Sequence, residues 1–273
     1  MERLHDRVNL DVDAYGVARV TLSRPDKMNA LDAAMFDGLI LAADRLRTWP
    51  GLRAVALHGE GRAFCAGLDM ANFAAMGKGE PQPVGATPLT KRTHGDANRF
   101  QQVAWQWRTL PVPVVAAVHG VALGGGLQIA LGADVRYVAA DARLSVLEIK
   151  WGLVPDMAGM ALLRELVRGD VARELTFSGR MVSGDEAVQL GLATRVCADP
   201  WDDALEFAHA VAERNPDAVR GAKRLLNQMH DARAEAVLLA ESVEQAALIG
   251  SPNQREAVAA ALAQRAPVFK DED

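Results

Sequence analysis

Three consecutive glycines, Gly124–Gly126, lie within the segment VHGVALGGGLQIALGAD (118–134). They lie between a stretch typical of a buried strand and a stretch with helical spacing, and glycine lets the backbone approach a ligand or another segment closely. N–H groups at the start of a helix have no intrahelical partner and lie at the positive end of the helix dipole. Such a turn can bind an anion, or an oxygen that becomes anionic during a reaction. Close packing of a helix on a sheet would also explain these glycines.

Alternating strand and helix patterns predict an α/β fold. The predicted strands are 8–12, 17–22, 53–58, 113–119, 134–139 and 193–196, and the predicted helices include 32–46, 97–108 and 183–190. Strands that alternate with helices favour an α/β core with right-handed crossovers. Residues 77–95 are rich in Gly, Pro and Thr, which predicts a long loop.

The end of the chain has a different pattern. From Trp201 onward it is helical almost throughout, and Pro216 and Pro252 fall where helices would begin, because proline suits the first helical turn. The 273 residues are enough for one large core with a helical extension. We therefore predict a core over residues 1–200 and a C-terminal helical region over residues 201–273.

Composition excludes several classes of protein. The net charge of −5 gives no basic face for nucleic acid or an anionic membrane. The longest apolar stretch, residues 110–131, is broken by prolines and glycines and is not expected to span a membrane. The N-terminus lacks the apolar segment of a signal peptide, and the two cysteines, Cys65 and Cys197, form no metal-binding pattern. We expect a cytoplasmic protein without a metal.

Five segments in order resemble the crotonase superfamily, the enoyl-CoA hydratase/isomerase group, over nearly the whole chain. They are SRPDKMNAL (23–31), GRAFCAGLDM (61–70), VHGVALGGGLQIALGAD (118–134), LEIKWGLVPDMAG (147–159) and GDEAVQLGLATRV (184–196). The resemblance implies a spiral of ββα units with a C-terminal helical region that builds a homotrimer or a dimer of trimers. It also implies an acyl-CoA substrate, with coenzyme A as part of the substrate and no separate cofactor.

The resemblance assigns the glycine run to the thioester. In this family two backbone N–H groups hold the thioester carbonyl and stabilise the enolate formed on proton transfer. Position by position, these oxyanion-hole donors are the N–H groups of Leu68 and Gly125. The residues expected to contact CoA are Ala66, Gly67, Asp69 and Gly124, with Arg24 and Lys27 as candidates for its phosphates. Exposed basic residues are also ordinary surface residues.

Acid–base chemistry points to Glu148 and Asp156. The hydratases of this family use two glutamates, at the positions of Gln128 and Glu148, and a carboxamide cannot exchange a proton at neutral pH. Apolar neighbours would raise the pKa of Glu148 into the range of a general acid or base. Simple hydratases have glycine at the position of Asp156, whereas the dienoyl-CoA isomerase branch has aspartate there. That branch also has an acidic residue where Gln128 stands, and an Asp after Pro155 is in addition a common turn residue.

We therefore expect an enzyme that moves a double bond of an unsaturated fatty acyl-CoA. Glu148 would be the principal base, Asp156 its partner, and Gln128 would orient substrate or water. Hydration of trans-2-enoyl-CoA with Glu148 as the sole carboxylate is one alternative. Thioester hydrolysis and a non-catalytic CoA-binding scaffold are the others.

Overall fold

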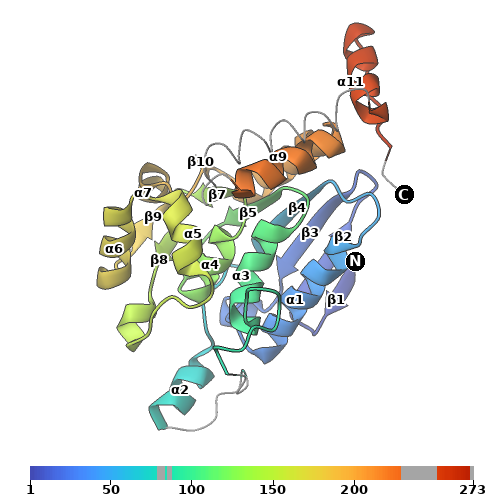
Figure 1. Ribbon diagram of the computed structural model, residues 1–273. Coiled ribbons are helices and arrows are strands. Elements are labelled where there is room, and N and C mark those ends of the chain that lie inside the picture. Colours follow the sequence, from blue (N-terminus) through green and yellow to red (C-terminus); the bar gives the residue numbers. More distant parts are fainter. Residues whose placement is uncertain (79–83, 85–87, 229–250, 271–273) are drawn as a thin grey trace.

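A seven-stranded sheet forms the centre of the molecule, in the order β1-β2-β3-β4-β5-β7-β10 (Figure 1). Its strands are β1 (Glu2–Leu4), β2 (Val8–Val12), β3 (Val17–Leu22), β4 (Ala54–Gly59), β5 (Val114–Val118), β7 (Val135–Ala139) and β10 (Arg195–Cys197). The β1–β2 and β2–β3 pairs are antiparallel, and all pairs from β3 to β10 are parallel. The computed structural model describes residues 1–78, 84, 88–228 and 251–270.

A second, smaller sheet has three strands. It contains β6 (Val121–Leu123), β8 (Arg143–Ser145) and β9 (Val182–Ser183), with β8 in the middle. The chain passes from β5 to β6 through Gly120, whose φ is +60° and where a Cβ would lie 2.0 Å from the carbonyl oxygen of Arg62. Only glycine fits this crossing, which places β6 and the helix after it beside the loop that follows β4.

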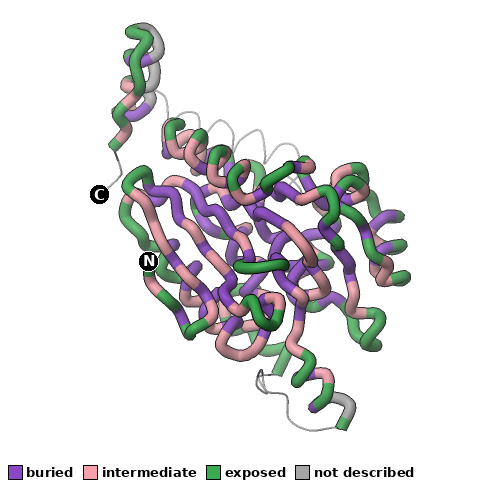
Figure 2. Tube along the Cα trace, turned by 180° about the vertical axis from the view of Figure 1, so that it is seen from behind, coloured by how far each residue is buried: buried purple, intermediate pink, exposed green. Residues whose placement is uncertain are grey.

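Helices cover both faces of the large sheet. Along β4 the side chains alternate: Val55 and Leu57 belong to the main core, whereas Ala54 and Ala56 pack in a second cluster with α8 (Pro200–Ala212). The main core lies between the sheet and the helices α1 (Ala33–Arg47), α3 (Arg99–Thr109) and α4 (Gly125–Leu131). Strands buried on both faces are typical of parallel sheets, and Figure 2 shows the strands as the most continuously buried part of the chain.

The helix starts follow the sequence signals. Asp32 accepts a hydrogen bond from the Met35 N–H at the start of α1, and Ser183 accepts one from the Glu186 N–H at the start of α7 (Gly184–Leu190). These contacts cap the two helices, because a side-chain oxygen satisfies an N–H group that the helix leaves free. The remaining helices are α2 (Met70–Lys78), α5 (Gly159–Leu166), α6 (Gly169–Ser178), α9 (Pro216–Gln228) and α11 (Pro252–Leu262), with 3-10 helices η1 (Pro25–Lys27) and η2 (Glu148–Trp151).

The first part of the predicted helical region packs on the sheet. In addition to α8, α9 is anchored by Lys223, whose Nζ donates to the carbonyl oxygens of Trp107 and Val112 and to Asp134 Oδ2 at 2.7 Å. By contrast, α11 lies apart from the sheet, beyond one end of α9 (Figure 1).

Two sequence predictions fall partly on undescribed residues. Residues 229–250 of the predicted helical region, and 79–83 and 85–87 of the predicted loop, lie outside the described residues. The loop prediction was wrong at its start, because residues 77 and 78 belong to α2. No helix in the described ranges has the length and apolar character needed to cross a membrane.

Candidate active site

A cavity of about 930 Å³ lies where the loop before α2, the start of α4 and the segment from η2 to α5 meet. Seven of the residues predicted from the sequence line it: Ala66, Gly67, Leu68, Gly124, Gly125, Glu148 and Asp156. Its volume is at the upper end of the range of small-molecule sites. The structure thus brings both predicted N–H donors and both predicted carboxylates to one cavity.

Short β-bridges hold the two N–H donors close together. Cys65 pairs with Ala122 of β6, and Leu68 pairs with Leu31. Between them, Gly67 has a φ of +86°, and a Cβ there would lie 2.5 Å from the Leu123 oxygen and 3.7 Å from the Gly125 nitrogen. Among the described residues, neither the Leu68 nor the Gly125 N–H has a protein acceptor. Both remain available to an oxygen in the cavity.

Each glycine of the run has its own steric reason. A Cβ on Gly126 would lie 2.3 Å from the carbonyl oxygen of Cys65, so this glycine serves the packing of α4 on the loop. A Cβ on Gly125 would lie 2.6 Å from the sulfur of Met157. Gly124 has a φ of +50°, and a Cβ there would lie 3.1 Å from Glu148 Oε1. The run therefore combines close packing with access to the cavity.

Glu148 lies at the start of η2 with one oxygen bonded and one unpaired. Its Oε1 accepts a hydrogen bond of 2.7 Å from Gln128 Nε2, while Oε2 is buried without a hydrogen-bond partner in the described structure. Burial raises the pKa of Glu148 above its ordinary value against the opposing hydrogen bond from Gln128, and the charge of Asp156 raises it further. Such a carboxyl can exchange a proton nearer neutral pH than an exposed one.

Asp156 lines the same cavity and keeps access to solvent. It follows Pro155, as the turn interpretation requires, but its carboxyl is also part of the cavity wall. Burial by the surrounding protein raises its pKa above the ordinary value for aspartate. Two carboxyls with raised pKa values in one cavity are typical of acid–base sites, because like charges that share a site oppose each other's ionisation.

Gln128 lies behind Glu148 and does not line the cavity. The side chain is 3% exposed, and its Oε1 accepts hydrogen bonds from the N–H groups of Met157 (2.9 Å) and Gly159 (2.8 Å). With its Nε2 bonded to Glu148, the amide can adopt only one orientation. Gln128 was predicted to orient substrate or water, whereas in the structure it orients the Glu148 carboxyl.

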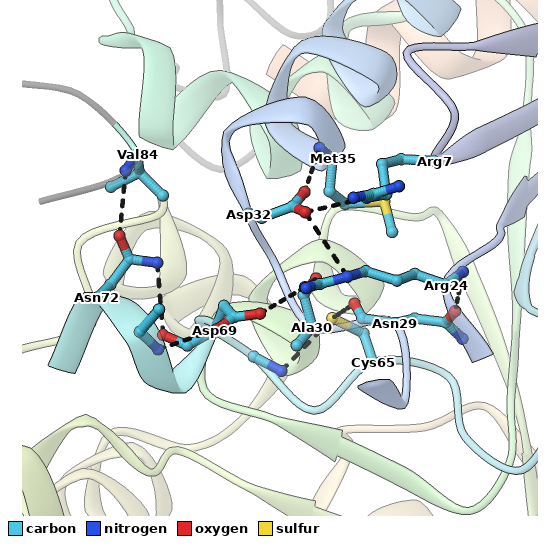
Figure 3. Close-up of polar contacts among 12 residues, drawn as sticks. Arg7, Arg24, Asn29, Ala30, Asp32, Met35, Cys65, Asp69, Asn72 and Val84 are labelled. Atoms are coloured by element: carbon cyan, nitrogen blue, oxygen red, sulfur yellow. Dashed lines mark hydrogen bonds and ion pairs between the residues drawn. The ribbon is translucent and has the colours of Figure 1, made fainter. Parts of the chain in front are cut away.

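The predicted phosphate contacts, Arg24 and Lys27, do not line the cavity. Arg24 Nη1 donates to Asp69 Oδ2 at 2.5 Å, and its Nε lies 3.6 Å from Asp32 Oδ2 (Figure 3). Although burial opposes its ionisation, the hydrogen bond from the Ala71 N–H and the ion pair with Arg24 hold the pKa of Asp69 below its usual value. Arg24 and Asp69 therefore fix the loop that carries Leu68, and Lys27 remains exposed on η1.

A buried amide that no sequence pattern indicated, Asn29, supports this loop. Asn29 Nδ2 donates to the carbonyl oxygens of Ala63 (2.8 Å) and Phe64 (3.2 Å). The Cys65 thiol donates to the Asn29 carbonyl (Figure 3). Asn29 has a φ of +56°, a conformation that asparagine tolerates better than most residues. Complete burial raises the pKa of Cys65 to about 12, so its thiol stays protonated in this loop.

The aromatic part of the cavity wall was also only partly anticipated. Phe73 of α2 stacks on Trp151 of η2, with ring centroids 4.1 Å apart and an interplanar angle of 18°. Phe36 and Phe100 meet edge to face at 5.3 Å. Trp151 lies in the LEIKWGLVPDMAG segment that carries the resemblance, but nothing in the pattern paired it with Phe73. Within the described ranges, no group of three or more His, Cys, Asp or Glu side chains could hold a metal ion.

Comparison with known proteins agrees with this geometry. The family model described as enoyl-CoA hydratase/isomerase matches residues 13–272. A Bacillus subtilis (strain 168) protein named "Probable enoyl-CoA hydratase" is 33% identical, with 97% of this chain and 99% of that protein covered. The mitochondrial Delta(3,5)-Delta(2,4)-dienoyl-CoA isomerase of Dictyostelium discoideum is 25% identical, with 94% and 89% covered.

A solved structure supports the fold. The crystal structure of enoyl-CoA hydratase from Bacillus anthracis superimposes with a TM-score of 0.85 at 28% identity, covering 97% of this chain and all of that one. This match confirms the predicted crotonase-like α/β fold. The relatives include both hydratases and isomerases, so they establish action on an acyl-CoA but not which of the two reactions takes place.

Proposed function

The chain belongs to the enoyl-CoA hydratase/isomerase family, and from this premise we propose that it moves a carbon–carbon double bond along an acyl-CoA. The observation that carries the proposal is the pair of carboxyls, Glu148 and Asp156, on the same cavity as the two N–H donors. Gln128, at the position of the second hydratase glutamate, has no access to the cavity. The two acidic groups that line the cavity are therefore Glu148 and Asp156, and the amide of Gln128 supplies no second carboxylate beside Glu148.

In the proposed reaction the thioester oxygen accepts hydrogen bonds from the Leu68 and Gly125 N–H groups. The ionised carboxylate of Glu148 removes a proton from the acyl chain, and the electron pair of that C–H bond moves toward the carbonyl to form a conjugated enolate. Asp156, in its protonated form, then delivers a proton to a more distant carbon and the double bond shifts. Proton transfer back through solvent restores both groups, so atoms and charge balance over the cycle.

The structure supports the roles proposed for the two N–H donors and the two carboxyls. Backbone donors that are fixed before the substrate arrives stabilise a developing oxyanion without reorganisation, and the loss of one such donor costs about 10²–10³ in rate in other enzymes. A positioned acid or base contributes about 10²–10⁴. The raised pKa values of Glu148 and Asp156 allow one to be ionised while the other is protonated, as a relay requires.

Hydration of a trans-2-enoyl-CoA is the second candidate. The hydrogen bond from Gln128 occupies Oε1 of Glu148 and leaves Oε2 without a partner among the described residues. A carboxylate with one free oxygen can act as a single base that activates water. In that reaction Asp156 would be dispensable. The role of Asp156 therefore distinguishes the two candidates.

To test the proposal, the purified protein is incubated separately with trans-2-enoyl-, 3-enoyl- and 3,5-dienoyl-CoA. Hydration, the double-bond shift and the release of free CoA are each measured. We expect a double-bond shift that is lost in Asp156→Asn. Rapid hydration without isomerisation, at equal rates in the wild type and Asp156→Asn, would refute the proposal in favour of the second candidate. Release of CoA alone would indicate a hydrolase, and CoA binding without turnover would indicate a scaffold.

We propose in addition that the chain forms a homotrimer or a dimer of trimers through its C-terminal region. The position of α11, apart from the sheet, supports this proposal, because a helix that stands off its own core has surface for a neighbouring copy. Light scattering of the full chain measures the mass directly, and a monomer at micromolar concentration would refute it.

A further inference from the structure

We propose that the acyl group is uncharged and apolar beyond its reacting carbons, and that acyl groups ending in a carboxylate are rejected. This inference rests on the proposed function, because it assumes that an acyl-CoA enters the cavity. It names the chemical class of acyl group from the charges and rings of the wall.

The first observation is the charge of the wall. Among the described lining residues, the ionisable side chains are Glu148 and Asp156, both acidic, and none is Lys, Arg or His. None of them is Ser, Thr, Asn or Gln either. A second carboxylate brought into this cavity by the substrate would lose hydration without gaining a cation.

The second observation is that a cation behind the wall, Arg99, is already neutralised. Arg99 lies 5.5 Å from the ring centroid of Phe36, but its Nη2 donates to Asp37 at 2.7 Å and its Nη1 donates to the Val84 carbonyl at 2.8 Å. On the other side, Lys150 places Nζ 5.5 Å from the Trp151 ring, and it does not line the cavity. Lys150 is therefore the residue through which the inference is most easily tested.

The third observation is the apolar surface left uncovered at the cavity. Met70, Leu89 and Val154 line it and are 61%, 53% and 68% exposed, next to the stacked rings of Phe73 and Trp151. Large apolar side chains gathered on one exposed patch mark a binding surface. An acyl chain laid along this wall would cover them, and the free energy gained would grow with each methylene group.

The experiment measures binding of saturated acyl-CoAs, which cannot undergo the double-bond reaction, by calorimetry on the full chain. Acetyl-, hexanoyl-, octanoyl- and decanoyl-CoA form the length series, and the octanoyl analogue with a terminal carboxylate is the matched probe. We expect the affinity to rise about fourfold per methylene until the cavity is filled. The carboxylate-ended probe should bind at least about tenfold more weakly than octanoyl-CoA, because it is desolvated beside two acids.

Variants assign the effect to the wall. Phe73→Ala and Trp151→Ala should flatten the length dependence, whereas Phe177→Ala, which removes a 71% exposed ring away from the cavity, should leave it unchanged. Val154→Lys should restore binding of the carboxylate-ended probe. Equal binding of the two octanoyl probes would overturn the inference, and loss of that binding in Lys150→Met would identify the cation responsible.

The outcomes separate this inference from the proposed function. If the affinities follow the expected order but no enoyl-CoA is turned over, the acyl class stands and the proposed reaction fails. If double bonds are shifted but affinity depends neither on chain length nor on the terminal charge, the reaction stands and the acyl class fails.

Discussion

Replacing Gln128 by glutamate is the sharpest test of how Glu148 is held. The new carboxylate can still accept the hydrogen bonds from the Met157 and Gly159 N–H groups through one oxygen. Its other oxygen would replace a donor that lies 2.7 Å from Glu148 Oε1. The substitution thus keeps the shape of the site and exchanges an attractive contact for a repulsive one.

The size of the effect follows from that distance. With their nearest oxygens at this distance, the centres of charge of the two carboxylates would lie about 4 Å apart. Two unit charges at that separation, with an effective dielectric constant of about 20, repel by about 4 kcal/mol, which corresponds to nearly a thousandfold in an ionisation equilibrium. One of the two carboxyls therefore keeps its proton at neutral pH, and the pair titrates as a unit. Because the base must be ionised to remove a proton, the acidic limb of kcat/KM should move to higher pH.

The assay is the pH dependence of kcat/KM for the double-bond shift in the wild type and in Gln128→Glu. Gln101→Glu is the matched control, because it introduces the same charge near Arg92 on the surface, away from the cavity. An acidic limb that stays in place in Gln128→Glu, with the fold intact, would refute the contact between Gln128 and Glu148 as the determinant of its ionisation. An equal displacement in Gln101→Glu would show a general charge effect instead.

Three further substitutions test the site and the anchor of α9. Glu148→Gln should reduce turnover by about 10²–10⁴. The same variant should be more stable than the wild type at neutral pH. Burial raises the pKa of Glu148 in the folded protein, so the free energy of unfolding of the wild type falls as pH rises above the ordinary value of 4.5. Denaturant unfolding at neutral pH and at a pH below 4.5 should show that the gain in stability disappears in acid. Gly67→Ala should lower kcat by about 10² with KM changed less, since its Cβ would collide with the Leu123 oxygen and displace the Leu68 N–H; normal kcat in this variant would argue against that donor. Lys223→Met should cost about 3–5 kcal/mol of unfolding free energy, because it leaves Asp134 and two carbonyl groups without their buried partner; urea unfolding measures the loss, and Lys223→Met combined with Asp134→Asn should recover part of it.

The sequence predicted the cavity residues well where the constraint is local. The glycine run, with its strand before and helix after, predicted a turn open to a ligand, whereas Leu68 and Gly125 were assigned as the donors only through the resemblance to the crotonase superfamily. Both rest on backbone conformations that few residues can adopt, such as the φ of +86° at Gly67. Signals of this kind are visible in one sequence because the steric requirement excludes the alternatives.

The direction of Gln128 could not be predicted in the same way. It stands one helical turn after Gly125, so spacing alone gives it a place near the cavity. Its side chain is held instead by the N–H groups of Met157 and Gly159, about thirty residues away in sequence, and no local pattern reports contacts of that range. The same reason applies to Arg24, whose partner Asp69 is forty-five residues distant.

Short elements were missed for a different physical reason. The strands of the small sheet are two or three residues long, too short for alternation to be recognised. The helix α2 follows Asp69, whose Oδ1 accepts from the Ala71 N–H, and Asn72 Oδ1 accepts from the Val84 N–H. The Asp69 contact is local to the start of α2, the Asn72 contact joins α2 to Val84 twelve residues later, and the periodicity of the helix itself gave no signal.

The Gln128 bridge has a consequence for which carbon atoms can react. One amide joins the Glu148 carboxyl to the backbone of the segment that carries Asp156, so the two acids are mounted on a single rigid support. The backbone between residues 148 and 157 then sets the distance between the two carboxyls, and this distance determines which carbon atoms of the acyl chain they can reach. Lengthening that segment by one residue should change the position at which the double bond is delivered, more than the rate at which it moves.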